Sequence, residues 1–190
     1  MTDNAMPVPA INSAIAVANW FIGQNAEQPS GLTHLKLQKM LYLAQGWHLA
    51  YFDVPLFEDP IEAWKYGPVV RSVYFALRSR AKNEIISAPI EGYVFRGGVD
   101  YEPLGTPEMV FRDDSVREFM ESVWDTYREK SAWQLVGMTH AKGSPWDTVA
   151  NSPGGLVAVG DTGFLTEYFD SIIPTELMRA YFKSYLSGDV

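Results

Sequence analysis

The sequence predicts a mainly α-helical fold: a single compact helical domain over residues 1–190 with a minor, short β element. Apolar residues recur at helical spacing over most of the chain, and small polar residues or prolines stand where helices would begin. Extended patterns occupy only two short stretches, near residues 60–66 and 92–96. We expect residues 1–9 to be flexible and residues 81–112, which contain several prolines and glycines, to form an irregular insertion.

The clearest predicted helix follows Thr33, a residue suited to the N-cap position, and extends to about residue 51. Its apolar residues recur every three or four positions, so we expect Lys36, Lys39 and Gln45 to face water. Other helices are predicted over residues 11–25, 68–80, 114–130 and 132–139, in a short turn from residue 145, and from residue 175 onward.

The stretch EAWKYGPVV joins an extended segment to one of these predicted helices. Gly67 supplies a permissive backbone, and Pro68 fits the first helical position, where its missing N–H needs no partner. Two interpretations of Glu62, Lys65 and Tyr66 remain open. They form either an edge strand packed by its aromatic residues, with Lys65 lying over one ring or paired with Glu62, or an exposed surface that binds another protein, with Lys65 held between its two aromatic neighbours.

The charge of the chain limits its partners. There are 23 acidic and 15 basic residues, which give a net charge of −8. A field of this sign repels nucleic acid and favours a basic partner, so DNA is not expected to be a ligand. The sequence also has no cysteine, no apolar run of membrane-spanning length and no signal peptide, which predicts a soluble cytoplasmic protein.

The three histidines do not form a recognisable catalytic or metal-binding motif. His34 is expected to be solvated, His48 to be a partly buried structural residue, and His140 to interact with carbonyl groups at a helix end. There is no HExxH spacing, no GxSxG and no phosphate-binding glycine motif. We therefore expect no catalytic residues, no metal site and no cofactor.

Three stretches together resemble the Panacea domain, which occurs in SocA-like antitoxins and in phage-associated GepA proteins. They are LTHLKLQKMLYLAQGWHLAYFDVPLFEDPIEAWKYGPVVRSVY, MTHAKGSPWDTV and IPTELMRAYF, and the resemblance spans about residues 17–185. The residues that match its motifs are Lys36, Gln38, Lys39, Tyr42, Gln45, Trp47, His48, Glu62, Trp64, Lys65, Tyr66, Gly67, Pro68, His140, Ser144, Pro145 and Trp146.

The resemblance implies an antitoxin, not an enzyme, which neutralises a cognate toxin by direct protein contact. It also implies a second role, as an adaptor that delivers the toxin to a Clp-type protease. The residues hypothesised to contact the toxin are Glu62, Lys65, Tyr66, His48 and His140.

Two other functions were weighed from the residues. One is an enzyme of phage or mobile-element origin, in which His140 or His48 forms an acid–base pair with Glu62. The other is a transcriptional regulator of its own gene, against which the net charge of −8 and the lack of a recognition-helix motif both argue.

Overall fold

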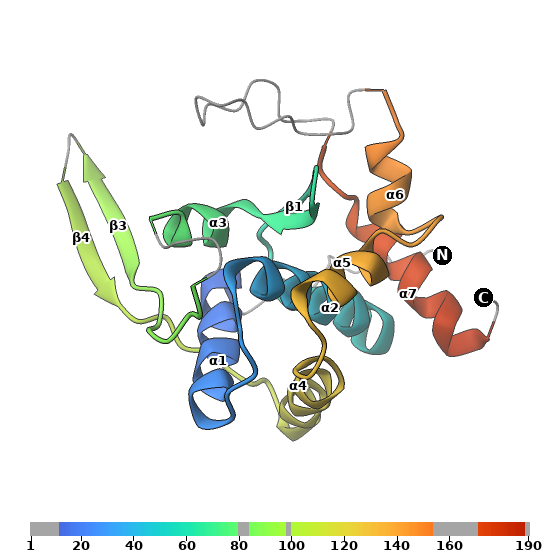
Figure 1. Cartoon of the computed structure of the whole chain (residues 1–190). Coiled ribbons are helices and arrows are strands. Elements are labelled where there is room, and N and C mark those ends of the chain that lie inside the picture. The colour runs from blue at the N-terminus through green and yellow to red at the C-terminus, as the bar shows by residue number, and fades with distance from the viewer. Residues whose placement is uncertain (1–11, 80–83, 98–99, 154–170, 189–190) are drawn as a thin grey trace, which may run out of the picture.

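The computed structural model confirms a mainly helical fold with little β structure (Figure 1). It describes residues 12–79, 84–97, 100–153 and 171–188, with the backbone alone over 93–97 and 100–104, so the segment predicted to be flexible lies outside the described residues. The elements in chain order are α1 (Ala14–Glu27), α2 (His34–Phe52), β1 (Ile61–Trp64), β2 (Gly67–Val70), α3 (Arg71–Leu77), β3 (Gly92–Gly97), β4 (Asp100–Gly105), α4 (Asp114–Tyr127), α5 (Ala132–Thr139), α6 (Pro145–Ala150) and α7 (Thr175–Ser187).

Helix α2 is the centre of the fold. It contacts α1, α3, α4, α5, α7 and β2, and 15 of its 19 residues are buried. The expectation that Lys36, Lys39 and Gln45 face water is therefore wrong, since their exposed fractions are 2%, 0% and 4%. The prediction assumed an amphipathic surface helix, but a helix surrounded by other elements has no solvent-facing side.

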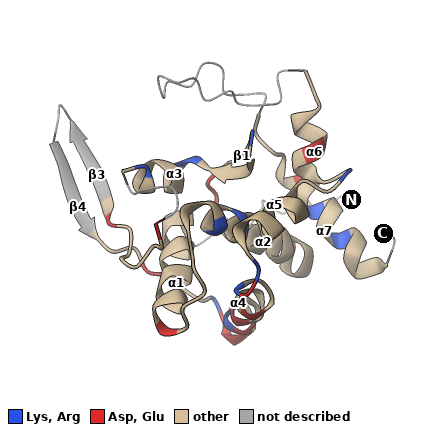
Figure 2. Cartoon of the chain, viewed as in Figure 1, with Lys and Arg blue, Asp and Glu red and all other residues tan. Residues whose placement is uncertain are grey.

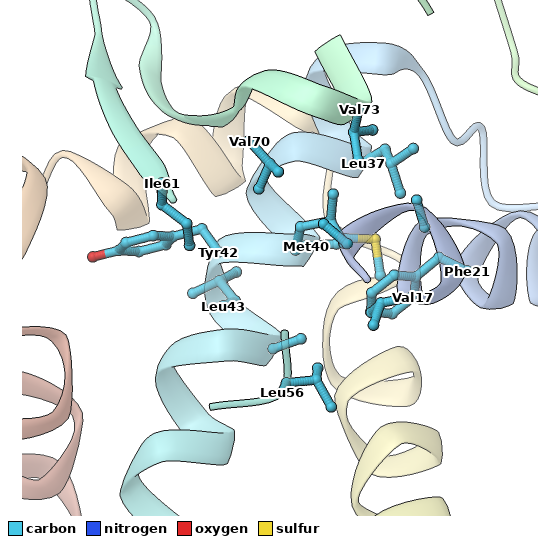
Figure 3. Close-up of a cluster of buried hydrophobic side chains, with 14 of the residues drawn as sticks. Val17, Phe21, Leu37, Met40, Tyr42, Leu43, Leu56, Ile61, Val70 and Val73 are labelled. Carbon is cyan, nitrogen blue, oxygen red and sulfur yellow. The ribbon is translucent and has the colours of Figure 1, made fainter. Parts of the chain in front are cut away.

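Apolar side chains from several elements meet against α2 (Figure 3). Phe21 from α1, Met40 and Leu43 from α2, and Ile61 and Val70 from the first hairpin are all buried there. Because each of these elements contributes to one cluster, the hairpin is fixed to the helical body by burial as well as by hydrogen bonds.

Four helices begin where the sequence predicts. The side chains of Thr33, Asp113, Ser131 and Ser144 each accept a hydrogen bond from a backbone N–H in the first turn of the helix that follows. Ser131 also forms a reciprocal capping box with Gln134. These short-range signals are reliable because they depend on neighbouring residues alone.

The helix predicted from Pro68 begins later than expected. Residues Gly67–Val70 form β2, which pairs antiparallel with β1, and α3 begins only at Arg71. Pro68 is tolerated in this strand because it lies opposite Ala63, whose amide donates to Ser171 on the other edge of β1, so the β1–β2 pair needs no N–H at this position. The register pairs Trp64 with Gly67 and leaves Lys65 and Tyr66 as a two-residue turn.

A second hairpin lies in the region predicted to be irregular. The strand expected near residues 92–96 is confirmed as β3, which pairs antiparallel with β4. Strand β4 was not predicted, because Pro103 and the flanking glycine argued against a strand there. In Figure 1 this hairpin extends away from the helices.

The chain returns to β1 near its C-terminal end. The amide of Ala63 donates to the carbonyl of Ser171 at 2.7 Å, and the amide of Ile173 donates to the carbonyl of Ile61 at 2.8 Å. Strand β1 therefore has backbone partners on both edges. Helix α7 follows and packs on α2 at Gly46, where an added Cβ would lie 2.2 Å from the Phe182 ring.

Candidate functional site

The buried amine of Lys39 connects α2 to the β1–β2 hairpin. Its Nζ donates a 2.9 Å hydrogen bond to the carbonyl oxygen of Pro68. Among the described residues no carboxylate pairs with it, and burial lowers its pKa to about 7. The amine is thus held by a neutral acceptor in a setting that disfavours its charged form.

Gln38 makes a second connection between α2 and the hairpin. Its side-chain oxygen accepts from the Val70 amide at 2.8 Å, and its side-chain nitrogen donates to the Val70 carbonyl at 3.4 Å. The amide side chain therefore occupies the place of a neighbouring strand at the end of β2. Gln45 acts similarly further along α2, where it bonds the Leu56 amide and both backbone groups of Phe57.

Gly67 lies where three segments meet. Its φ of 99° is a conformation that residues with a side chain rarely adopt. A Cβ added to it would lie 2.7 Å from the Nζ of Lys39 and 2.9 Å from the Nε2 of His140. The hairpin backbone can approach α2 and the end of α5 this closely only because residue 67 has no side chain.

His140 and Trp146 hold the other side of the hairpin. The two rings are stacked, with centroids 3.6 Å apart and an interplanar angle of 3°. The indole N–H of Trp146 donates to the carbonyl of Trp64 at 2.9 Å. Burial, and then the charge on Lys39, lower the pKa of His140, and its Nε2 is buried without a hydrogen-bond partner among the described residues. His140 lies at a helix end as predicted, because it is the C-cap of α5, but the expected bond from its ring to a helix carbonyl is not seen among the described residues.

Glu62 does not lie on an exposed face as hypothesised, because only 3% of it is exposed. Its carboxylate is 2.5 Å from a guanidinium nitrogen of Arg71 and accepts a 2.8 Å hydrogen bond from the indole N–H of Trp64. Trp64 is itself buried and packs against Tyr74, with ring centroids 4.7 Å apart. The charge of Glu62 is therefore compensated inside the protein.

Lys65 and Tyr66 are the exposed residues of the hairpin. The exposed fraction of Tyr66 is 57%, and the Lys65 Nζ lies 5.5 Å from the centroid of its ring. Lys65 is not held between two aromatic rings, because Trp64 points into the protein. An exposed pair thus stands on a hairpin whose eight strand residues are all buried.

The remaining histidines lie elsewhere on α2. His48 is buried, as expected; its Nδ1 is 2.8 Å from the Val54 carbonyl oxygen, and burial is the main cause of its lowered pKa. It is nine residues from Lys39, roughly 13 Å along the helix. His34 was expected to be solvated but is buried against Tyr74, and burial lowers its pKa to about 4.

The structure thus brings Glu62, Lys65, Tyr66 and His140 to one end of the molecule and leaves His48 apart. Sequence reasoning missed the parts played by Lys39 and Gln38, although their place in a shared motif with Gly67 could have indicated a common contact.

Among the described residues no group of histidines and carboxylates could hold a metal ion. No helix in the described part of the chain is long and apolar enough to cross a bilayer.

Comparisons with known proteins identify the family of the chain. The family model of the SocA-like antitoxin Panacea domain matches residues 37–147, which contain most of α2, the β1–β2 hairpin, α5 and the start of α6. A curated relative named antitoxin SocA, from Caulobacter vibrioides (strain NA1000 / CB15N), is 36% identical over 152 residues, covering 80% of this chain and 78% of the relative. No solved structure matches the chain. The chain therefore belongs to the family of SocA-like antitoxins with a Panacea domain.

Proposed function

We propose that this protein is an antitoxin that neutralises a cognate toxin by direct contact, and that the turn of the β1–β2 hairpin is part of the contact surface. Membership of the SocA-like family supports the antitoxin role. The proposal names Lys65 and Tyr66 as the residues that touch the toxin.

The observation that carries this assignment is the difference between the hairpin and its turn. All eight strand residues are buried, whereas Lys65 and Tyr66 are exposed. Lys39, Gln38 and Trp146 fix the hairpin backbone by hydrogen bonds from beneath. A turn held in this way loses little conformational freedom when it binds, which favours affinity.

The other three hypothesised contact residues have different parts in the proposal. Glu62 and His140 are positioning residues, because they hold the hairpin through Arg71 and Trp146 and offer little surface themselves. His48 supports the end of α2 through its bond to Val54. The carboxylate of Glu62 is already paired with Arg71. This pairing disfavours the enzyme alternative, in which Glu62 would exchange a proton with a histidine.

The second role, delivery of the toxin to a Clp-type protease, extends the same proposal. An adaptor must hold its cargo and present it to the protease, so the toxin contact at the hairpin would serve both roles. In this proposal, neutralisation and delivery both take place in the cytoplasm.

Neutralisation is the direct test. The open reading frames on either side of this gene are each induced alone, with this protein, or with a Tyr66→Ala variant. Growth arrest that wild-type protein relieves supports the antitoxin role, and arrest that it does not relieve contradicts it. The half-life of the toxin, measured with and without an active Clp protease, separates simple binding from delivery for degradation.

A further inference from the structure

Two surface turns lie on the same side of the molecule, held there by two contacts. The Nε2 of His140, at the end of α5, lies beside Gly67 of the hairpin, 2.9 Å from the position a Cβ would occupy. The indole N–H of Trp146, at the start of α6, donates to the Trp64 carbonyl at 2.9 Å. These contacts bracket both the hairpin turn and the turn between α5 and α6, so the two turns are fixed relative to each other.

The exposed charges on the two turns are positive. Lys65 is exposed on the hairpin turn and Lys142 on the turn between α5 and α6, and within the described residues neither forms an ion pair. The nearby carboxylates are occupied. Glu62 is buried against Arg71, and Asp147 is half-buried and accepts a 2.8 Å hydrogen bond from the Gly143 amide.

An exposed aromatic ring is adjacent to one of these lysines. Tyr66 follows Lys65 directly, and its exposed fraction is 57%. Tyrosine and tryptophan lose little side-chain entropy on binding and are frequent energetic anchors of protein interfaces.

We propose that this surface, the hairpin–turn face (Lys65, Tyr66 and Lys142), binds an acidic segment of the toxin. Carboxylates of that segment would lie near the two ammonium groups, and an apolar residue beside them would pack on the Tyr66 ring. The inference rests on the proposed function and adds the chemistry of the partner. The net charge of −8 favours a basic partner, whereas this inference names an acidic one. The two differ because attraction at an interface depends on the charges close to it. Figure 2 shows acidic residues on α4, away from the two turns, and an acidic segment on α6, which contains Asp147.

The test is a charge reversal at both lysines. The affinity of the purified toxin identified by the neutralisation test is measured for wild type and for Lys65→Glu/Lys142→Glu, at low and high salt. We expect the double variant to bind about tenfold more weakly or worse at low ionic strength, and the difference to shrink at high salt. The control is Arg117→Glu/Lys130→Glu, which changes net charge by the same amount at two residues that form no ion pair within the described residues, and it should bind as wild type does.

The melting temperature of every variant is measured alongside, since both lysines are exposed and their reversal should leave the fold intact. A folded double variant that binds as tightly as wild type, or more tightly, overturns the inference.

Selection of toxin mutants that restore neutralisation by the double variant gives a second readout. Replacement of toxin Asp or Glu by Lys or Arg supports an acidic segment, and replacement of toxin basic residues overturns it. Failure of wild-type protein to bind the toxin would instead contradict the proposed function itself.

Discussion

The amine of Lys39, which is fully buried in α2, donates a hydrogen bond to the carbonyl of Pro68 in the β1–β2 hairpin. Burial lowers the pKa of this amine to about 7, so the folded protein holds the proton less tightly than the unfolded chain does. Between about pH 7 and pH 10 the unfolded chain therefore binds more protons, and stability rises with pH. Below pH 7 both states carry the proton and this contribution no longer changes.

Replacement of the amine tests this directly. We expect Lys39→Met to show a smaller rise in melting temperature between pH 7 and pH 9.5 than wild type, so that its stability relative to wild type falls as pH increases. A part of the rise remains, because burial also lowers the pKa of Lys36. His34, whose pKa is about 4, and His140, whose pKa is also lowered, change charge below this window. Melting curves at several pH values check the prediction, with Lys65→Met as the exposed-lysine control. Parallel curves for Lys39→Met and wild type would contradict it.

Gly67→Ala should destabilise the protein through the backbone and through contact. The residue has a φ of 99°, and its Cβ would meet Lys39 and His140. We expect a loss of about 1–3 kcal/mol. That corresponds to ~2–4 °C in melting temperature for each kcal/mol in a chain of this size. Gly137→Ala is the matched control: this glycine lies inside α5 with no atom near its Cβ position, so it should gain about 0.5–1 kcal/mol. Equal effects at both positions would contradict the strain argument.

Gly46 and Phe182 should be energetically coupled. A Cβ on Gly46 would lie 2.2 Å from the Phe182 ring, so Gly46→Ala must displace α7 from α2. We expect a loss of about 1–3 kcal/mol from overpacking. In a Phe182→Leu background, which removes the ring, the same substitution should cost less. Urea unfolding of the four proteins in this double-mutant cycle gives the coupling energy, and a value near zero would show that α7 adjusts without strain.

Gln45→Met should expose the importance of the buried amide. It keeps the length of the side chain but leaves the amides of Leu56 and Phe57 without their acceptor. Unsatisfied buried groups cost about 1–3 kcal/mol each, so chemical denaturation should show a clear loss of stability. Gln24→Met, a similar change on α1 away from these loops, serves as the control. If both variants unfold at the same denaturant concentration, the loop does not depend on Gln45.

Tyr66→Ala should weaken toxin binding by more than about 1 kcal/mol if the ring is an anchor at the interface. The ring is 57% exposed, so its removal should leave the melting temperature almost unchanged. Calorimetric titration with the toxin and a melting curve on the same sample measure the two effects. A folded variant with wild-type affinity would remove Tyr66 from the interface.

The sequence predicted the features that depend on near neighbours. The N-caps at Thr33, Asp113 and Ser131 each bond a backbone amide three residues on, so their signals survive without knowledge of the fold. The errors were tertiary in origin. Lys39 resembles a solvent-facing lysine until other elements cover α2, and residues 67–70 became a strand because β1 offered a partner.

The candidate site could be predicted only in part. The exposure of Lys65 and Tyr66 agrees with one of the two interpretations drawn from the residues, but the burial of Glu62 depends on Arg71, whose proximity no local pattern shows. The proximity of the α5–α6 turn to the hairpin joins residues that are about 75 positions apart, and a single sequence has no signal at that range.

The return of residues 171–173 to β1 has a consequence for synthesis of the protein. The outer edge of β1 is covered only when this segment, close to the end of the chain, has been made. Until then a growing chain presents unpaired amides and carbonyls beside an aromatic turn, a template on which other strands can pair. A chain released before residues 171–173 have been made would thus be prone to aggregation and to proteolysis.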